Sequence, residues 1–178
     1  MDDLKWAIAR EIPHLRRYAR TLLRDADGAD DLVQDCLERA LRKRHLWQRT
    51  GSLRSWLFRI VFTQFVNGSA RRARARRSEG LEAVDGVRAM PPAQEAHAEA
   101  IEVLDALFLL DEDQRAAILL VAVEGMSYDE AADALGIPIG TLRSRLWRGR
   151  EALRSIRPEL PGRSRPGLRG IGKLRRVK

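Results

Sequence analysis

A helix, a tight turn and a second helix are predicted over residues 127–154, and this stretch constrains the fold more than any other part of the chain. Ser127 and Glu130 have the spacing of a capping box, in which each side chain accepts a hydrogen bond from the other residue's backbone N–H. Gly136 supplies the positive φ that ends a helix, and Pro138 suits the start of the next one. The pattern therefore predicts a helix-turn-helix.

The second helix of this motif has two chemically different faces. At about 100° per residue, its inward face consists of Leu142, Leu146, Gly149 and Leu153. The outward face carries Arg143, Ser144, Trp147, Arg148 and Glu151. Arg can bind guanine through two hydrogen bonds in the major groove, and apolar atoms can contact the thymine methyl group. The face is typical of DNA recognition, with an ordinary solvated basic face as the alternative.

The positive charge of the chain is concentrated at its C-terminal end. The 178 residues carry a formal net charge of +8 with an isoelectric point near 10.6, which indicates an acidic partner, most simply nucleic acid. Residues 141–178 contain 13 Lys and Arg against 2 Asp and Glu, whereas residues 1–140 contain 20 against 23. The basic character therefore belongs to the second helix of the motif and to the tail.

Several other classes of protein are excluded by the sequence. No apolar run approaches the ~18 residues of a membrane span, and the N-terminus lacks a signal-peptide pattern, so we expect a cytoplasmic protein. The single cysteine, Cys36, is predicted to be a small buried residue. His14, His45 and His97 have no Cys or carboxylate at metal-ligand spacing. Phosphate-binding loops and nucleophile motifs are absent, so we expect no catalytic residue, metal or cofactor.

Two helices are predicted in the first 46 residues. Apolar residues recur every three or four positions across residues 3–24, residues 25–30 are predicted to form a turn, and a second helix extends from about Ala29 to Leu46. The outward face of this second helix is polar and mostly acidic: Asp31, Gln34, Asp35 and Glu38. Such a face repels DNA, so we expect it to meet either a protein partner or solvent.

A short loop and a long helix follow. Residues 47–52 contain Gly51 and are predicted to form a loop, and Ser52 can cap a helix that extends to about residue 77. The end of this helix is strongly basic, with Arg71, Arg72, Arg74, Arg76 and Arg77. A basic helix end near an aromatic-bearing loop is typical of surfaces that bind phosphates and unstacked bases. The alternative is a solvated helix end, where cations are favourable in any case.

The remaining segments complete a two-domain prediction. Residues 78–95 lose helical periodicity and gather Gly and Pro, which indicates a flexible linker. Helical periodicity returns from residue 96, and residues 158–178 combine Pro, Gly and Arg in a pattern typical of disorder. The chain is therefore predicted to be all-α, with two small helical domains at residues 1–77 and 96–157.

These residues together resemble a known family. The chain is similar over residues 8–156 to sigma factors of the sigma-70 family, in the small extracytoplasmic-function (ECF) group, and its layout most resembles the alphaproteobacterial general-stress type. ADDLVQDCLERAL (29–41) resembles region 2.2 of the family and SLRSWLFRI (52–60) resembles region 2.3. Residues 113–153 resemble region 4. Three motifs in the same order are more specific than a helix-turn-helix alone.

The resemblance implies a role for each motif. Region 2.2 would bind core RNA polymerase through Asp31, Gln34, Asp35 and Glu38. The region 2.3 loop and helix would capture a flipped base of the minus-10 element, with candidate residues Trp47, Arg49, Ser52, Arg54, Trp56 and Arg59. Region 4 would read the minus-35 element through Thr141, Arg143, Ser144, Trp147 and Arg148. Family members are commonly inhibited by an anti-sigma factor, so we expect one here.

The chain also departs from the family pattern. Phe62 and Thr63 stand where relatives usually have Arg-Asn, and Asp111 and Glu112 stand where they usually have a Pro pair. Two other functions remain as alternatives. A stand-alone helix-turn-helix regulator that does not bind polymerase would leave the acidic helix and the 47–52 loop without roles, and an RNA-binding protein would account for the charge but not for the turn geometry.

Overall fold

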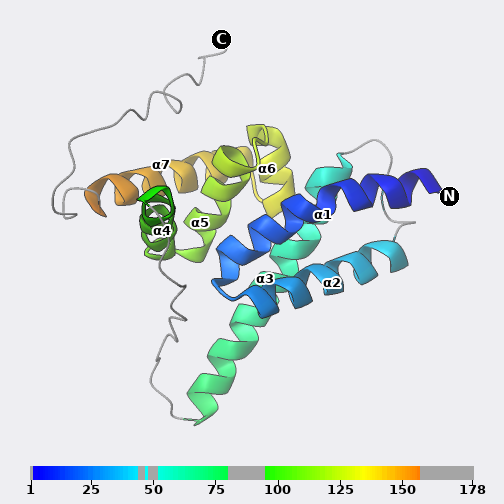
Figure 1. Ribbon diagram of the computed structural model, residues 1–178, viewed down its shortest axis with the longest axis horizontal. Coiled ribbons are helices and arrows are strands. Elements are labelled where there is room, and N and C mark those ends of the chain that lie inside the picture. The colour runs from blue at the N-terminus through cyan, green and yellow to red at the C-terminus, as the bar shows by residue number, and fades with distance from the viewer. Residues whose placement is uncertain (1, 44–46, 48–51, 80–94, 157–178) are drawn as a thin grey trace.

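The computed structural model describes residues 2–43, 47, 52–79 and 95–156, and within them the chain is helical with no strand (Figure 1). The all-α prediction is confirmed. None of the described helices combines the length and the apolar character needed to cross a membrane. In chain order the elements are α1 (Asp2–Leu23), α2 (Ala26–Arg42), α3 (Leu53–Glu79), α4 (Glu95–Phe108), α5 (Glu112–Ile118), the π-helical turn η2 (Leu119–Val123), α6 (Tyr128–Leu135) and α7 (Ile139–Ile156).

The predicted turn at residues 25–30 is shorter than expected. Arg24 has φ +55°, and α2 begins at Ala26 because the Asp25 side chain accepts hydrogen bonds from the backbone N–H groups of Asp27 and Gly28. An aspartate that can cap a helix also favours turns, so its position alone does not decide between the two. At its other end α2 stops at Arg42, and residues 44–46 of the predicted helix lie outside the described residues.

Helix α3 begins where the sequence predicts. The Ser52 hydroxyl accepts a hydrogen bond from the backbone N–H of Ser55 at 3.3 Å, and the helix continues to Glu79. Of the predicted linker, Ser78, Glu79 and Glu95 are helical, and residues 80–94 lie outside the described residues. The last turns of α3 extend away from the other helices (Figure 1).

The N-terminal half is a three-helix unit. Helices α1 and α2 pack along one another, and α3 packs against both. The rings of Tyr18 from α1 and Phe58 from α3 meet edge to face with their centroids 5.1 Å apart, and both are buried. Cys36 from α2 is buried beside them, and its thiol lies 3.6 Å from the Leu57 carbonyl oxygen.

The C-terminal half contains the predicted helix-turn-helix. Both hydrogen bonds of the Ser127–Glu130 capping box are present, and Gly136 has φ +67° at the end of α6. Helix α5 packs against α7, where Gly149 is so close to α5 that an added Cβ atom would lie 2.7 Å from Ile118 Cδ1. The absence of a side chain at Gly149 thus sets the distance between these helices.

The two halves are packed against each other. Helix α3 contacts α6 along its first half, and α1 contacts both α5 and η2. Buried apolar residues from both halves form one continuous cluster. At the edge of this contact the buried guanidinium of Arg115 donates to the Leu22 carbonyl oxygen at 3.2 Å and lies 4.7 Å from the centre of the Phe108 ring.

The close approach of α5 and α7 makes the two glycines of α7 respond differently to substitution. We expect Gly149→Ala to lower the free energy of unfolding by about 1 kcal/mol, because overpacking of about 1–3 kcal/mol outweighs the ~1 kcal/mol gain in helix propensity. Gly140, where an added Cβ atom would meet nothing within 4 Å, is the matched control, and Gly140→Ala should raise stability. Denaturant unfolding of both variants measures the difference, and equal stabilisation by the two would contradict this packing.

Candidate nucleic-acid and protein interfaces

Helix α7 presents one buried face and one exposed face, as predicted. Its buried residues are Leu142, Leu146 and Gly149, and Leu153 is half-buried. On the other side Arg143 and Arg148 are exposed, and the Trp147 side chain is 65% exposed. A large exposed aromatic ring between two cations is unusual for a surface that meets only water.

The arginines of α7 differ in their partners. Arg145 reaches α5, where its guanidinium lies 2.6 Å from the Asp113 carboxylate. Arg143 and Arg148 have no ion pair or hydrogen bond with any described residue. Beside them the half-buried Ser144 donates its hydroxyl to the Thr141 carbonyl oxygen at 2.9 Å. The unpaired guanidinium groups remain able to donate several hydrogen bonds to an external acceptor.

The acidic face of α2 is exposed along its length. Asp31, Gln34, Asp35 and Glu38 all face solvent, and the only hydrogen bond among these four described residues joins the Gln34 amide to the Glu38 carboxylate at 3.4 Å. The neighbouring Asp30 is different, because Arg16 and Arg20 from α1 lie 3.6 and 3.3 Å from its carboxylate. The chain therefore neutralises Asp30 internally and leaves this acidic face available to a basic partner.

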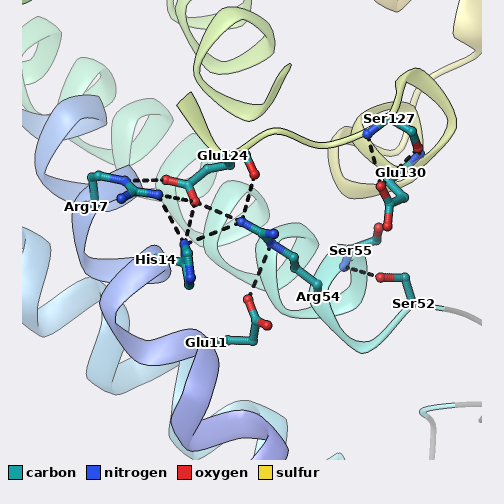
Figure 2. Close-up of polar contacts among 9 residues, drawn as sticks. All are labelled: Glu11, His14, Arg17, Ser52, Arg54, Ser55, Glu124, Ser127 and Glu130. Carbon is teal, nitrogen blue, oxygen red and sulfur yellow. Dashed lines mark hydrogen bonds and ion pairs between the residues drawn. The ribbon is translucent and has the colours of Figure 1, made fainter. Parts of the chain in front are cut away.

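The candidate residues around the 47–52 loop fall into four groups. Trp56 and Arg59 line an open pocket on α3, whereas Ser52 caps α3 and Trp47 is half-buried. Arg49 lies outside the described residues. Arg54 points toward the C-terminal half, where it contacts Glu124 (Figure 2).

The pocket beside Trp56 includes residues that the sequence does not mark as candidates. The last turn of α2 contributes Arg39 and Lys43, and α3 contributes Ile60 and Thr63. Three cations around an indole ring and an aliphatic side chain suit a planar, negatively charged ligand such as a nucleotide. Phe62, by contrast, is buried in the core and does not line the pocket. The centres of its ring and of the Phe65 ring are 6.4 Å apart.

Glu124 is the most buried charged group at the contact between the halves. Its side chain is 0% exposed and accepts hydrogen bonds from Arg17 at 2.8 Å and from Arg54 at 3.0 Å, and His14 Nδ1 lies 3.0 Å away (Figure 2). The hydrogen bonds to Glu124 raise the pKa of Arg17. Sequence spacing held no signal for this cluster, since Glu124 lies 70 to 110 positions from His14, Arg17 and Arg54.

Two features of the described residues concern metal and thiol chemistry. They contain no group of three His, Cys, Asp or Glu side chains that could hold a metal ion. Burial raises the pKa of Cys36 to about 12, so this thiol stays protonated and unreactive at neutral pH. The arrangement can bind anions at α7 and at the Trp56 pocket, and it can bind a basic surface at α2.

Comparison with protein families assigns both halves of the chain. Residues 8–62 match the family described as the sigma2 domain of PhyR, and residues 100–153 match the family described as sigma-70, region 4. The chain is 38% identical over 159 residues to the ECF RNA polymerase sigma factor EcfG of Rhodopseudomonas palustris, and the alignment covers 87% of this chain and 85% of that protein.

Two solved structures have the same fold. The sigma factor RpoE of Bartonella quintana, crystallised with the anti-sigma factor NepR, matches with a TM-score of 0.77 and 34% identity over 88% of this chain and 97% of that one. The anti-anti-sigma factor PhyR of the same organism, also crystallised with NepR, matches with a TM-score of 0.58 and 22% identity over 86% of this chain and 50% of that one. The second likeness concerns the fold alone.

Proposed function

The chain belongs to the ECF group of the sigma-70 family of RNA polymerase sigma factors, and we propose that it directs core polymerase to promoters by reading the minus-35 and minus-10 elements and helping to melt the DNA. The observation that carries this proposal is that one chain leaves three complementary surfaces unpaired. These are Arg143 and Arg148 of α7, the basic pocket beside Trp56 and the acidic face of α2. The protein acts by binding energy rather than by enzymatic chemistry.

Helix α7 is proposed to read the minus-35 element in the major groove. Arg143 and Arg148 supply unpaired guanidinium groups for base edges or phosphates, and Trp147 supplies an exposed apolar surface for a thymine methyl group. Thr141 and Ser144 lie nearer the start of the helix, where backbone and hydroxyl groups commonly meet phosphates. Arg145 has a different role, because its ion pair with Asp113 ties α7 to α5.

The pocket beside Trp56 is proposed to receive single-stranded minus-10 DNA. Extracting a base from the stack costs a few kcal/mol, and stacking on an aromatic side chain returns about 1–3 kcal/mol per base. Arg39, Lys43 and Arg59 surround the ring and are placed to hold the adjoining phosphates. Trp47, Arg49 and Ser52 remain candidates for the flanking contacts.

The acidic face of α2 is proposed to dock on core polymerase. Asp31 and Asp35 have no partner among the described residues, and Gln34 and Glu38 bond only each other. An unpaired acidic face increases the rate of encounter with a basic protein surface and repels DNA. Polymerase and DNA would therefore bind different surfaces of the chain. We further propose that an anti-sigma factor regulates this protein in a stress response, in keeping with the NepR complex of the RpoE relative.

A second candidate function has one observation in its favour. The family that matches residues 8–62 is described from PhyR, which is named an anti-anti-sigma factor in its crystal structure. A chain of this kind would bind an anti-sigma factor in place of a sigma factor and would not activate polymerase. In vitro transcription with core polymerase on a genomic fragment library separates the two, because only a sigma factor yields promoter-specific start sites.

The polymerase interface is tested by reversing charge on the acidic face. We expect Asp31→Lys with Glu38→Lys to weaken binding to core polymerase about 100-fold or more, because juxtaposed like charges cost several kcal/mol. Asp3→Lys with Glu102→Lys makes the same charge change on exposed positions of other helices and should have little effect. Affinity is measured by titration, and circular dichroism checks the fold. Equal affinities of the two double variants would overturn the assignment of α2.

The minus-35 interface is tested by removing one guanidinium at a time. Arg143→Ala or Arg148→Ala should cost about 1–3 kcal/mol at the preferred minus-35 sequence and should reduce discrimination against altered bases. Arg10→Ala removes the same charge from an exposed position on α1 and serves as the control. The measurement is transcription from matched and altered minus-35 elements with saturating core polymerase. If both α7 variants still discriminated between matched and altered minus-35 elements as the wild type does, another part of the chain would have to read the minus-35 sequence.

The minus-10 pocket is tested on the last turn of α2. Lys43→Ala and Arg39→Ala should each reduce promoter opening and lower the salt dependence of single-strand binding by roughly 0.7 in log–log slope, the value expected for one phosphate contact. Arg42→Ala removes an exposed cation from the same turn that does not line the pocket. Permanganate reactivity of promoter thymines reports opening. A loss of opening in Arg42→Ala equal to that in the other two would contradict a localised phosphate site.

A further inference from the structure

The pocket beside Trp56 is already formed in the free chain. Its walls are the last turn of α2 and the first three turns of α3, two helices that pack against each other. The backbone N–H of Lys43 donates to the Arg39 carbonyl oxygen at 2.9 Å, so both cations belong to one closed helical turn. The hollow measures about 180 Å³ and opens to solvent. A ligand can therefore enter without rearrangement of the two helices.

The cations around this pocket are not neutralised by the chain itself. The side chains of Arg39, Lys43 and Arg59 are exposed and make no ion pair or hydrogen bond with any residue that the structure describes. Glu38, the acidic residue that precedes Arg39 in the sequence, is bonded to Gln34 instead. Three unpaired positive charges therefore surround one small hollow.

A DNA strand brings little charge to any one point of its length. Each nucleotide of a strand carries one phosphate charge, and successive phosphates are spread along the backbone. A free nucleoside diphosphate or triphosphate instead carries its charges on adjoining groups, and its terminal phosphate alone has a charge of about −1.5 to −2 at neutral pH. Three cations beside a single indole ring therefore exceed what one nucleotide of a strand needs, and they match the charge of a free nucleotide.

Each kind of side chain in the pocket suits one part of a nucleotide. Trp56 and Ile60 offer an aromatic ring and an aliphatic surface to a base, and such stacking tolerates any base because every base has a π-face. The guanidinium groups of Arg39 and Arg59 suit bidentate contact with phosphate, whereas the ammonium group of Lys43 acts as a point charge. We therefore expect affinity to depend on the number of phosphates more than on the identity of the base.

We propose that the pocket beside Trp56 is a nucleotide site: it binds a free nucleoside diphosphate or triphosphate, with the base on Trp56 and the phosphates on the three cations around it. The pocket is open in the free protein, so the nucleotide binds before any contact with a promoter. If the pocket also receives the minus-10 strand, the two ligands exclude each other, and promoter opening requires release of the nucleotide. This last step rests on the proposed function, whereas the nucleotide site itself does not.

The site is tested by titrating the full chain with ATP, ADP, AMP and tripolyphosphate in a buffer without divalent cations. Isothermal titration calorimetry measures each dissociation constant. We expect ATP to bind about tenfold more tightly than AMP, which has a single phosphate, and than tripolyphosphate, which has no base. Equal affinities for ATP and tripolyphosphate would overturn the proposal, because an adventitious ion only would then explain the binding. The absence of ATP binding would overturn it as well.

Variants locate the site on the chain. Arg39→Ala and Lys43→Ala should each raise the dissociation constant for ATP about tenfold, because each removes one charge-assisted contact. Arg42→Ala removes an exposed cation of the same turn that does not line the pocket, so its dissociation constant should stay close to the wild-type value. Equal losses in all three variants would overturn the proposal, because net charge alone would then explain the binding.

The contribution of the ring is measured separately. Trp56→Leu keeps an apolar side chain but removes the stacking surface, so its affinity for ATP should fall to that for tripolyphosphate. Trp56 is half-buried, and circular dichroism therefore checks that the variant folds. If it does not fold, the comparison of Arg39→Ala and Lys43→Ala with Arg42→Ala decides the outcome.

Competition distinguishes the nucleotide site from the proposed function. A labelled single-stranded DNA of mixed sequence is bound to the wild-type protein and then titrated with ATP. Displacement of the strand at the ATP concentrations that calorimetry predicts would support one shared pocket. ATP binding that depends on Arg39 and Lys43 but leaves the strand bound would support the nucleotide site and refute the assignment of minus-10 DNA to this pocket. Strand binding without ATP binding would overturn the nucleotide site and leave the proposed function intact.

Discussion

Burial of the Glu124 carboxylate is the constraint on which the relative placement of the two halves depends. Apolar surfaces can pack in several registers at similar cost, whereas a buried charge accepts only the arrangement that brings its cations within hydrogen-bond distance. Arg17 and Arg54 meet Glu124 from two different helices of the N-terminal half. They therefore fix where the end of η2 lies relative to α1 and α3, and with it the position of the helix-turn-helix that follows.

Features set by neighbouring residues could be predicted from the sequence. The Ser127–Glu130 capping box, the positive φ of Gly136 and the two faces of α7 depend on residues within one or two helical turns, and all three are present. The sequence predicts the start of α2 three residues too late, because Asp25 suits both a turn and a helix cap. The choice between them is settled by packing of α2 on α1, which a local pattern does not contain.

Features set by distant residues could not be predicted. Arg54 and Arg143 look alike as exposed cations on amphipathic helices, yet one is bound by a carboxylate 70 positions away and the other has no partner among the described residues. Arg145 is likewise tied to Asp113. The candidate DNA-binding residues of a basic chain are those arginines that the fold leaves unpaired, and pairing is a property of tertiary contacts.

The replacement of the usual Arg-Asn pair by Phe62 and Thr63 illustrates how the fold limits the proposed minus-10 surface. Phe62 is buried next to Phe65, so a charged side chain at this position would lose its hydration without a compensating partner. Thr63 faces the pocket but carries no charge. The cations around Trp56 therefore come from positions other than 62 and 63. The last turn of α2 supplies two of them, Arg39 and Lys43. Because α2 also carries the acidic face, one rigid helix would couple polymerase docking to the position of the single-strand pocket.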